Sequence, residues 1–302
     1  MEEMTTGLCP KCGHTLQIPA ELERFSCMYC GERLTKRQLL TQPEEASCSE
    51  EDCAVSFDHA VSRLGWCVQN FRGYQKKILR DAFFEAFETY ETGCAPVIQE
   101  LNSGVRPERQ TELLDRAAEA MLGELSAGWE KKNDMEDEKV ILAIFFVPMV
   151  RKLQLPVSEE FVSLLQKKWV ERYPKSPFYL GDYESISGGF RKKFLGLCFI
   201  TTAVCQELGK PDDCAELTAF RAFRDGYLAA QPDGEALIRE YYNIAPGIVT
   251  CINTCSDRHA SYERIREQYL TPCYEDLLAG RNADCKTRYV QMVRDLEREY
   301  LN

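Results

Sequence analysis

Two pairs of cysteines near the N-terminus, separated by fourteen residues, constrain this chain more than any other feature. Residues 9–30 read CPKCGHTLQIPAELERFSCMYC, with Cys9 and Cys12 in the first pair and Cys27 and Cys30 in the second. Two cysteines spaced in this way can place both thiolates on one tetrahedral ion, at Zn–S distances of about 2.3 Å. The segment has too little apolar mass to fold alone, so we expect one zinc ion to supply its folding energy. Four thiolates leave no coordination position open, and the zinc is therefore expected to be structural.

The residues around the cysteines fit a zinc ribbon over residues 1–40. Gly13 and Gly31 each follow the second cysteine of a pair, where a tight turn often needs a positive φ that glycine adopts at little cost. Short strands are predicted at residues 15–18 and 24–26. Redox-active CxxC pairs are the main alternative, but they usually occur singly, near a βαβ pattern that this sequence lacks. His14 is expected at the surface, because the four thiolates already fill the metal site.

The ribbon is a poor candidate for binding nucleic acid. Residues 1–40 contain five basic and five acidic side chains, and a zinc ion with four thiolates adds two negative charges. Of the basic residues, only Arg33, Lys36 and Arg37 cluster in the sequence. Phosphate backbones are held by clustered Lys and Arg, so we expect the ribbon to contact protein or to be purely structural.

The composition of the whole chain predicts an acidic, cytoplasmic protein. Its 302 residues carry a net charge of -11, which disfavours nucleic acid and anionic membranes as partners. The N-terminus does not resemble a signal peptide, and the most apolar run, residues 140–150, is about half of the roughly 20 residues that span a bilayer. Fifteen cysteines in such a chain favour metal binding or catalysis over disulfides.

An acidic segment follows the ribbon. Residues 41–56 carry five acids and no base, with almost no large apolar side chain, and such a stretch cannot bury enough surface to order itself. We predict a flexible linker here; a second metal site at Cys48 and Cys53 lacks support from their spacing. Beyond the linker we predict an all-helical body, with one domain over residues 57–188 and another over residues 189–302, although the two could pack as one unit. The predicted fold class is therefore mainly α, with a small N-terminal β zinc ribbon.

Helical periodicity dominates the body. Apolar residues recur at three- and four-residue spacing from Leu64 to Tyr90, with a bend expected at Gly73. Residues 174–189 are rich in Pro, Gly and Ser but also in aromatics, which indicates a loop pinned to the body. Further helices are predicted over residues 107–125, 159–173 and 190–208, and another from residue 134 through the apolar run. Asp212 or Asp213 would cap the helix that follows residue 208. Two more helices are predicted after residue 259.

Several segments in the C-terminal half occur in a recognisable order. They are Cys198-Phe199-Ile200, Thr202-Ala203, Phe220-Arg221-Ala222-Phe223-Arg224-Asp225, Tyr241-Tyr242 and Ala245-Pro246. In these segments the chain resembles the CFI-box domain of bacterial proteins, some of which are similar in having an N-terminal zinc ribbon. Family members often have Tyr-Gly after Thr-Ala, whereas this chain has Val204-Cys205, so no role of that tyrosine is transferred. The resemblance implies a domain type rather than an activity.

The same region supplies the candidate pocket residues. These are Cys198, Thr202, Asp213, Arg221, Arg224, Asp225 and Tyr241. Cys198 and Cys205 would share one helix stripe with Thr202, and Cys251 and Cys255 one face of another helix. Three interpretations of these thiols stay open: buried small hydrophobes, a second metal site formed by all four, or redox or nucleophilic use of Cys198.

Catalysis by Cys198 would need a base to form the thiolate. The three histidines are His14, His59 and His259, and no motif connects any of them with Cys198. Arg221, Arg224 and Asp225 are expected to form a buried ion-pair network rather than an anion site. Gly188-Gly189, followed by basic residues, is only a weak phosphate-binding signal.

The sequence therefore favours an interaction protein, a zinc ribbon joined to a helical body that binds another protein or a small ligand. The alternative is an enzyme that uses thiol or Arg/Asp chemistry in a C-terminal pocket around Cys198. Another protein is the expected partner, and neither nucleic acid nor a membrane is expected. The sequence does not indicate an oligomeric state.

Overall fold

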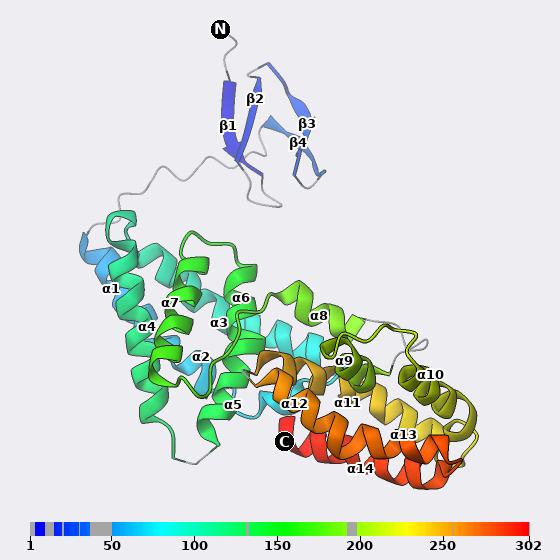
Figure 1. The fold of residues 1–302 in the computed structure, drawn as a ribbon. Helices are drawn as coiled ribbons and strands as arrows, with labels where there is room; N and C mark the ends of the chain where they lie inside the picture. The colour runs from blue at the N-terminus through cyan, green and yellow to red at the C-terminus, as the bar shows by residue number, and fades with distance from the viewer. Residues whose placement is uncertain are drawn as a thin grey trace. The chain divides into compact units, whose positions relative to one another are not determined.

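The chain forms two compact units, a small β unit in Met1–Ala54 and a mainly helical unit in Val55–Asn302 (Figure 1). The computed structural model describes residues 4–9, 15–19, 21–29, 31–36, 50–130, 133–191, 198–255 and 257–301. The predicted fold class, mainly α with a small N-terminal β region, is confirmed at this level.

The β unit consists of two antiparallel hairpins. Strand β1 (Met4–Leu8) pairs with β2 (Thr15–Pro19), and β3 (Arg24–Ser26) pairs with β4 (Arg33–Thr35). The two strands predicted from the sequence are β2 and β3, and each has a partner that the sequence analysis did not anticipate. Each hairpin loop contains one of the CxxC pairs. Cys9 directly follows β1, and Cys27 directly follows β3.

The linker predicted for residues 41–56 was wrong at its C-terminal end. Helix α1 (Glu50–Leu64) already begins at residue 50, and its first turn contains the three carboxylates of Glu50, Glu51 and Asp52. Negative charge stabilises the N-terminus of a helix through its dipole, so the acids that suggested disorder instead favour the helix start. Residues 41–49, which include Cys48, lie outside the described residues.

The helical unit is one packed body rather than two domains. Its buried side chains form a single hydrophobic cluster from Phe57 to Leu301, and the expected boundary at residue 189 falls inside a helix. Beyond α1 the helices are α2 (Trp66–Gln69), α3 (Phe83–Gly104), α4 (Gln110–Ala127), α5 (Asp134–Ile141), α6 (Val147–Lys152), α7 (Ser158–Arg172), α8 (Tyr183–Arg191), α9 (Phe199–Glu207), α10 (Ala215–Ala222), α11 (Gly234–Thr254), α12 (Arg258–Ile265), α13 (Thr271–Leu278) and α14 (Asn282–Tyr300).

Glycine and proline set several of the breaks between these helices. Gly73 has a φ of 94°, which confirms the expected bend, and the chain turns there between α2 and α3. Pro148 and Pro272 each follow a π-helical segment, Leu142–Phe146 and Arg266–Leu270 respectively. Proline has no backbone N–H, so the regular hydrogen-bond ladder is interrupted where it enters a helix.

The region around residues 174–208 differs from its prediction. Helix α8 occupies residues 183–191 where a loop was expected, because the Asp182 carboxylate caps it by accepting from the Ser185 backbone N–H over 2.8 Å. The helix expected over residues 190–208 is α9, which begins only at Phe199. Gly188 and Gly189 lie inside α8 rather than in a turn before a helix, so the phosphate-binding interpretation was wrong. Residues 192–197 lie outside the described part of the chain.

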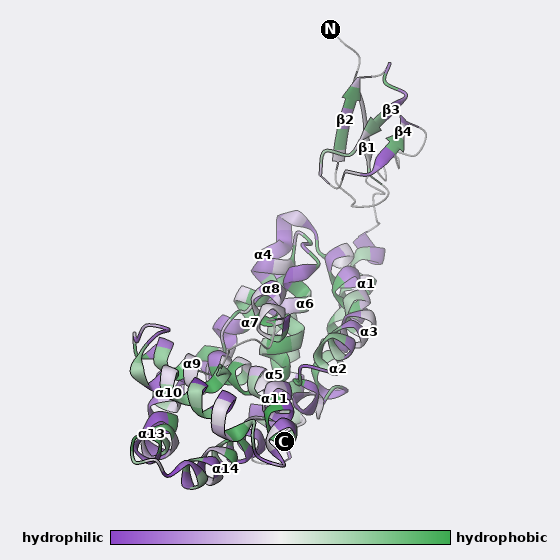
Figure 2. Ribbon diagram, turned by 90° about the vertical axis from the view of Figure 1, so that its right-hand side faces the viewer, coloured by the Kyte–Doolittle hydropathy of each residue, from purple (hydrophilic) through white to green (hydrophobic). Residues whose placement is uncertain are grey.

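Hydrophobic positions lie mainly between the helices, while the outer faces of α13 and α14 are hydrophilic (Figure 2). Helix α11 packs against α8, α9, α12 and α14 and so joins the C-terminal helices to the rest of the core. The apolar run at residues 140–150 is almost entirely buried in this core. Among the described residues, no helix is long and apolar enough to cross a membrane.

Candidate functional site

The first candidate site is the cysteine cluster of the β unit. Cys9 and Cys27 are both buried and, with Leu16 and Leu34, form the small core of that unit. The turn after Cys27 closes with the Gly31 N–H donating to the Cys27 carbonyl over 2.8 Å. Gly31 has a φ of 72°, as its position after a cysteine pair predicts. Cys12, Cys30, Gly13 and His14 lie outside the described residues.

These residues fit the predicted zinc ion. One buried cysteine comes from each hairpin loop, and both lie in the same core. The second cysteine of each pair follows three positions later in the sequence, which suits a tetrahedral ion with four thiolates. Cys9, Cys12, Cys27 and Cys30 would hold the ion, and it would cross-link two hairpins that share a core of only a few side chains.

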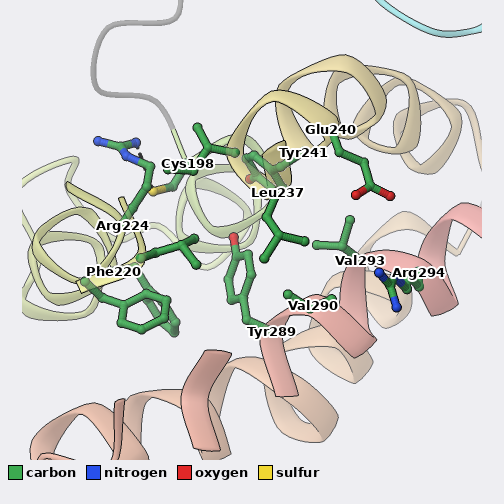
Figure 3. A pocket seen from close by; sticks show the side chains of 13 residues that line it. Cys198, Phe220, Arg224, Leu237, Glu240, Tyr241, Tyr289, Val290, Val293 and Arg294 are labelled. Atoms are coloured by element: carbon green, nitrogen blue, oxygen red, sulfur yellow. Dashed lines mark hydrogen bonds between the residues drawn. The ribbon is translucent and has the colours of Figure 1, made fainter. Parts of the chain in front are cut away.

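The second candidate site is a cavity of about 50 Å³ in the helical unit, beside Cys198 (Figure 3). Its walls come from the start of α9, from α10 and the segment that continues α10, and from α11 and α14. Cys198, Phe220 and Tyr241 are buried at its inner end, whereas Glu240 and Arg294 are exposed to solvent. The remaining lining residues are Phe223, Arg224, Leu228, Leu237, Ile238, Tyr289, Val290 and Val293. The wall is mostly apolar, with charge confined to Arg224 inside and to Glu240 and Arg294 at the rim.

Arg224 lies against the thiol of Cys198. Its Nη1 is 3.5 Å from Cys198 Sγ and donates to the Tyr242 hydroxyl over 3.1 Å. Its Nε and Nη2 donate to the two carboxylate oxygens of Asp225 over 2.6 and 2.9 Å. This bidentate pairing raises the pKa of Arg224 and lowers the pKa of the Asp225 carboxyl. The predicted pair of Arg224 and Asp225 is therefore present, and it fixes the guanidinium at the cavity wall. The expected buried network of three residues is not formed, because Asp225 is exposed and Arg221 pairs with Asp212 instead.

Two tyrosines, Tyr241 and Tyr289, also line the cavity. The Tyr241 hydroxyl accepts a hydrogen bond from the Ile200 backbone N–H over 3.0 Å, at the open first turn of α9. The Tyr289 hydroxyl lies 3.3 Å from Thr201 Oγ1. Burial raises the pKa of both tyrosines. Both hydroxyls therefore stay neutral and act as structural hydrogen-bonding groups that hold α9, α11 and α14 together.

The environment of Cys198 keeps its sulfur protonated. Burial raises the pKa of the thiol, and the positive charges of Arg224 and Arg221 only partly offset this effect. His59 hydrogen bonds Glu100 over 2.7 Å, and His259 lies 3.4 Å from a Glu207 oxygen. Within the described residues, neither histidine has an interaction with Cys198. The described part of the chain thus does not form the thiol–base pair that nucleophilic catalysis uses.

The structure brings together only some of the predicted pocket residues. Cys198, Arg224 and Tyr241 line the cavity, and Asp225 holds Arg224 from outside it. The other three predicted residues, Thr202, Asp213 and Arg221, do not line it. Arg221 donates to the carbonyl and the carboxylate of Asp212, each over 2.8 Å. Neither Asp212 nor Asp213 caps α10, whose N-cap residue is Cys214, because Asp212 is held by Arg221.

Part of the cavity wall was not predicted from the sequence. Tyr242 was recognised only as part of a paired-tyrosine segment, and its contact with Arg224 comes from the packing of α11 against the segment after α10. Tyr289 and Val293 fall on the apolar face of α14, where spacing alone indicates a core position. A cavity depends on which side chains fail to fill a space, and helical periodicity does not report that.

The four-thiol metal site considered for Cys198, Cys205, Cys251 and Cys255 is not formed. Cys255 Sγ contacts the Cys251 carbonyl within its own helix end, over 3.3 Å. Cys205 instead lies 3.8 Å, sulfur to sulfur, from Cys214. Burial raises the pKa of the Cys255 thiol to about 11 and raises that of Cys251 as well. Cys251 is therefore a small buried side chain and Cys255 a half-buried one.

The chain matches no protein family model, no curated protein and no solved structure in the comparisons made with each. Its resemblance to CFI-box proteins therefore remains a prediction from the segments around Cys198, and the function has to be argued from the two sites themselves.

Proposed function

We propose that this protein is a binding protein whose helical unit takes one apolar group into the cavity beside Cys198. The observation that carries the proposal is the character of that cavity: an apolar wall with a charged rim formed by Glu240 and Arg294. A cavity can hold one water molecule once it offers about 10–15 Å³, so a cavity of about 50 Å³ has room for a small aliphatic end. The group would belong to a side chain of a partner protein or to a small amphipathic ligand.

The β unit would be a second contact module. We propose that its shape depends on one zinc ion held by Cys9, Cys12, Cys27 and Cys30, with no catalytic role because the four thiolates complete its coordination. Met28 and Tyr29, between the second pair of cysteines, are exposed, which supports contact with another protein. The CFI-box resemblance of the C-terminal half is part of the same proposal and adds no activity to it.

An enzyme that uses Cys198 is the weaker alternative. Its support is the Arg224 contact, since a cation beside a thiol lowers the pKa of that thiol. Burial is the larger effect on Cys198, however, and the net change of its pKa is upward. Arg224 is also engaged by Asp225 and Tyr242. The geometry is therefore better suited to positioning side chains around a bound group than to forming a thiolate.

The proposal is tested by measuring the affinity of the full chain for a set of small aliphatic alcohols, amines and carboxylates. A V293F variant places a ring in the cavity and should weaken the binding of any hit by at least tenfold. The control is V170F on α7, because Val170 is exposed and does not line the cavity, and its affinities should match those of the wild type. Hits that bind wild type and V293F equally well would refute the proposal, as would a full set without one hit. If V293F is unstable, L237F serves the same purpose from α11.

A further inference from the structure

Cys205, Cys214 and Glu216 form a compact group at the junction of α9 and α10, and none of the three lines the cavity beside Cys198. Their ligand atoms, two sulfurs and a carboxylate oxygen, all lie within 4.8 Å of one another. Cys205 is buried, while Cys214 and Glu216 are half-buried. In the part of the chain that the structure describes, this is the only group of three such residues found at that spacing.

Local structure fixes this group. Helix α9 ends in a turn in which Gly209 has a φ of 67° and the Lys210 N–H donates to the Cys205 carbonyl over 2.8 Å. The chain then reverses so that Cys214 is the N-cap residue of α10 and Glu216 is in its first turn. The short connection therefore returns Cys214 to the end of the helix that contains Cys205.

The spacing of the two sulfurs suits one tetrahedral ion. Two thiolates at about 2.3 Å from a zinc ion lie roughly 3.8 Å apart when the angle at the metal is tetrahedral. Cys205 and Cys214 are 3.8 Å apart, sulfur to sulfur. A thiol–thiol hydrogen bond alone would give the same separation. Glu216 as a third donor and the space beside it are the features that favour a metal ion.

A cavity of about 60 Å³ adjoins the group, and Cys205, Lys210, Glu216 and Arg266 are among its lining residues. Such a space allows a fourth, exchangeable ligand such as water. Nε of Arg266 is buried and has no hydrogen-bond partner among the residues described, so a donor is available to a group in that space. Three protein ligands and one open position are typical of an open zinc site.

The charges also balance. Lys210 Nζ is 2.5 Å from Glu216 Oε1, which leaves the other carboxylate oxygen for an ion. Two thiolates and one carboxylate carry three negative charges, and a divalent ion with the Lys210 ammonium neutralises them. An outer cation of this kind holds the carboxylate in place, as outer hydrogen bonds orient ligands in metal sites.

We propose that Cys205, Cys214 and Glu216 bind a zinc ion with an open fourth position, distinct from the ion of the β unit. On binding, two Zn–S bonds and one Zn–O bond form, and the two thiol protons leave to the buffer. No oxidation is involved. Thiolate ligands with a carboxylate favour zinc over magnesium or calcium, which prefer oxygen alone.

Metal content of the full chain after dialysis against zinc with a phosphine reductant tests this site. We expect C214S to hold one zinc ion fewer per chain than the wild type, and E216Q to bind that ion at least tenfold more weakly. The matched control is C255S, because Cys255 is also half-buried in the helical unit but lies outside the group; its zinc content should equal that of the wild type.

The C27S variant distinguishes the two zinc sites. It should lose the ion of the β unit and keep the ion bound by Cys205, Cys214 and Glu216. Cobalt binding provides an independent measurement, because thiolate ligands of cobalt produce charge-transfer absorbance. This absorbance should be lower in C214S than in the wild type and unchanged in C255S. Equal zinc content in wild type and C214S would overturn the proposal. If C214S fails to fold, E216Q alone decides, and an unchanged affinity in that variant would also overturn it.

Discussion

The guanidinium of Arg224 lies against the thiol of Cys198, with Nη1 and Sγ 3.5 Å apart. The orientation of the guanidinium is fixed by Asp225, the next residue in the chain. The two carboxylate oxygens of Asp225 accept hydrogen bonds from the Nε and Nη2 atoms of Arg224. The contact looks at first like the activation of a nucleophile. Because the sulfur is buried and neither His59 nor His259 contacts it in the described part of the chain, Arg224 instead closes one wall of an apolar cavity.

The first prediction concerns the stability that Arg224 provides. R224M removes hydrogen bonds to Tyr242 and Asp225 from a side chain that is nearly buried, so urea unfolding should show a loss of about 1–3 kcal/mol. R239M is the control, since Arg239 is exposed and pairs only along its own helix with Glu235. The R239M substitution should leave the midpoint of urea unfolding almost unchanged. Equal losses in the two variants would contradict the role given to Arg224.

The second prediction concerns the reactivity of Cys198. Its raised pKa means that little thiolate is present near neutral pH, and only the thiolate reacts with alkylating agents. We expect iodoacetamide to modify Cys198 more slowly in the folded chain than in urea, with a rate that rises continuously above pH 8.5. Peptide mass spectrometry measures this residue by residue. One fast-reacting cysteine at position 198 would instead support the enzyme alternative.

The third prediction is a loss of stability at high pH, for which Cys251 is the clearest probe. Burial raises its pKa in the folded chain, whereas an unfolded thiol titrates near about 8.5. Above that pH the unfolded chain releases the proton and the folded chain keeps it, so the free energy of unfolding falls as pH rises. The contribution is intact below about pH 8.5 and declines above it by at most about 1.4 kcal/mol per pH unit.

Urea unfolding of C251A between pH 8 and pH 10 tests this prediction. The variant should have a shallower decline than the wild type, because it no longer contains this thiol. V249A, a neighbouring substitution on α11 that removes no titrating group, should keep the wild-type slope. Parallel slopes for the wild type and C251A would show that Cys251 is not held as the protonated thiol.

The fourth prediction concerns the β unit. Removal of zinc by a chelator should abolish the dispersed amide signals of the described residues within 4–36, since the small core around Leu16 and Leu34 cannot hold two hairpins alone. Signals from residues 55–301 should persist, apart from those near Cys205. C27S should reproduce the effect of the chelator on the β unit. Retention of all signals after chelation would contradict a structural zinc ion there.

Different physical signals explain what the sequence could and could not predict. Apolar spacing located α7 to within one residue and α4 to within three, and Gly73 marked the turn before α3. The start of α1 was missed because the acids of residues 50–52 indicate disorder by composition and stabilise a helix start by position. Helix α8 was missed because its glycines outweighed the cap provided by Asp182. Where two local features of the sequence favour different structures, tertiary packing decides which structure forms.

The same distinction holds for the cavity. The segments around Cys198 and Arg224 directed attention to the correct end of the fold, and the structure places both residues in one wall. Leu237 and Val293 come from α11 and α14, far apart in the sequence, and each has the spacing of an ordinary core residue. The pairing of Cys205 with Cys214 was also not predictable, because it depends on the turn at Gly209.

The position of a bound hit is the most direct test of the binding function. Intermolecular NOEs, or a crystal structure of the complex with the tightest small aliphatic hit, locate it. The account predicts contacts from its apolar end to the methyl groups of Leu237, Ile238, Val290 and Val293, with its polar end toward Glu240 or Arg294. A hit that binds elsewhere on the helical unit, or one joined covalently to the sulfur of Cys198, would contradict it.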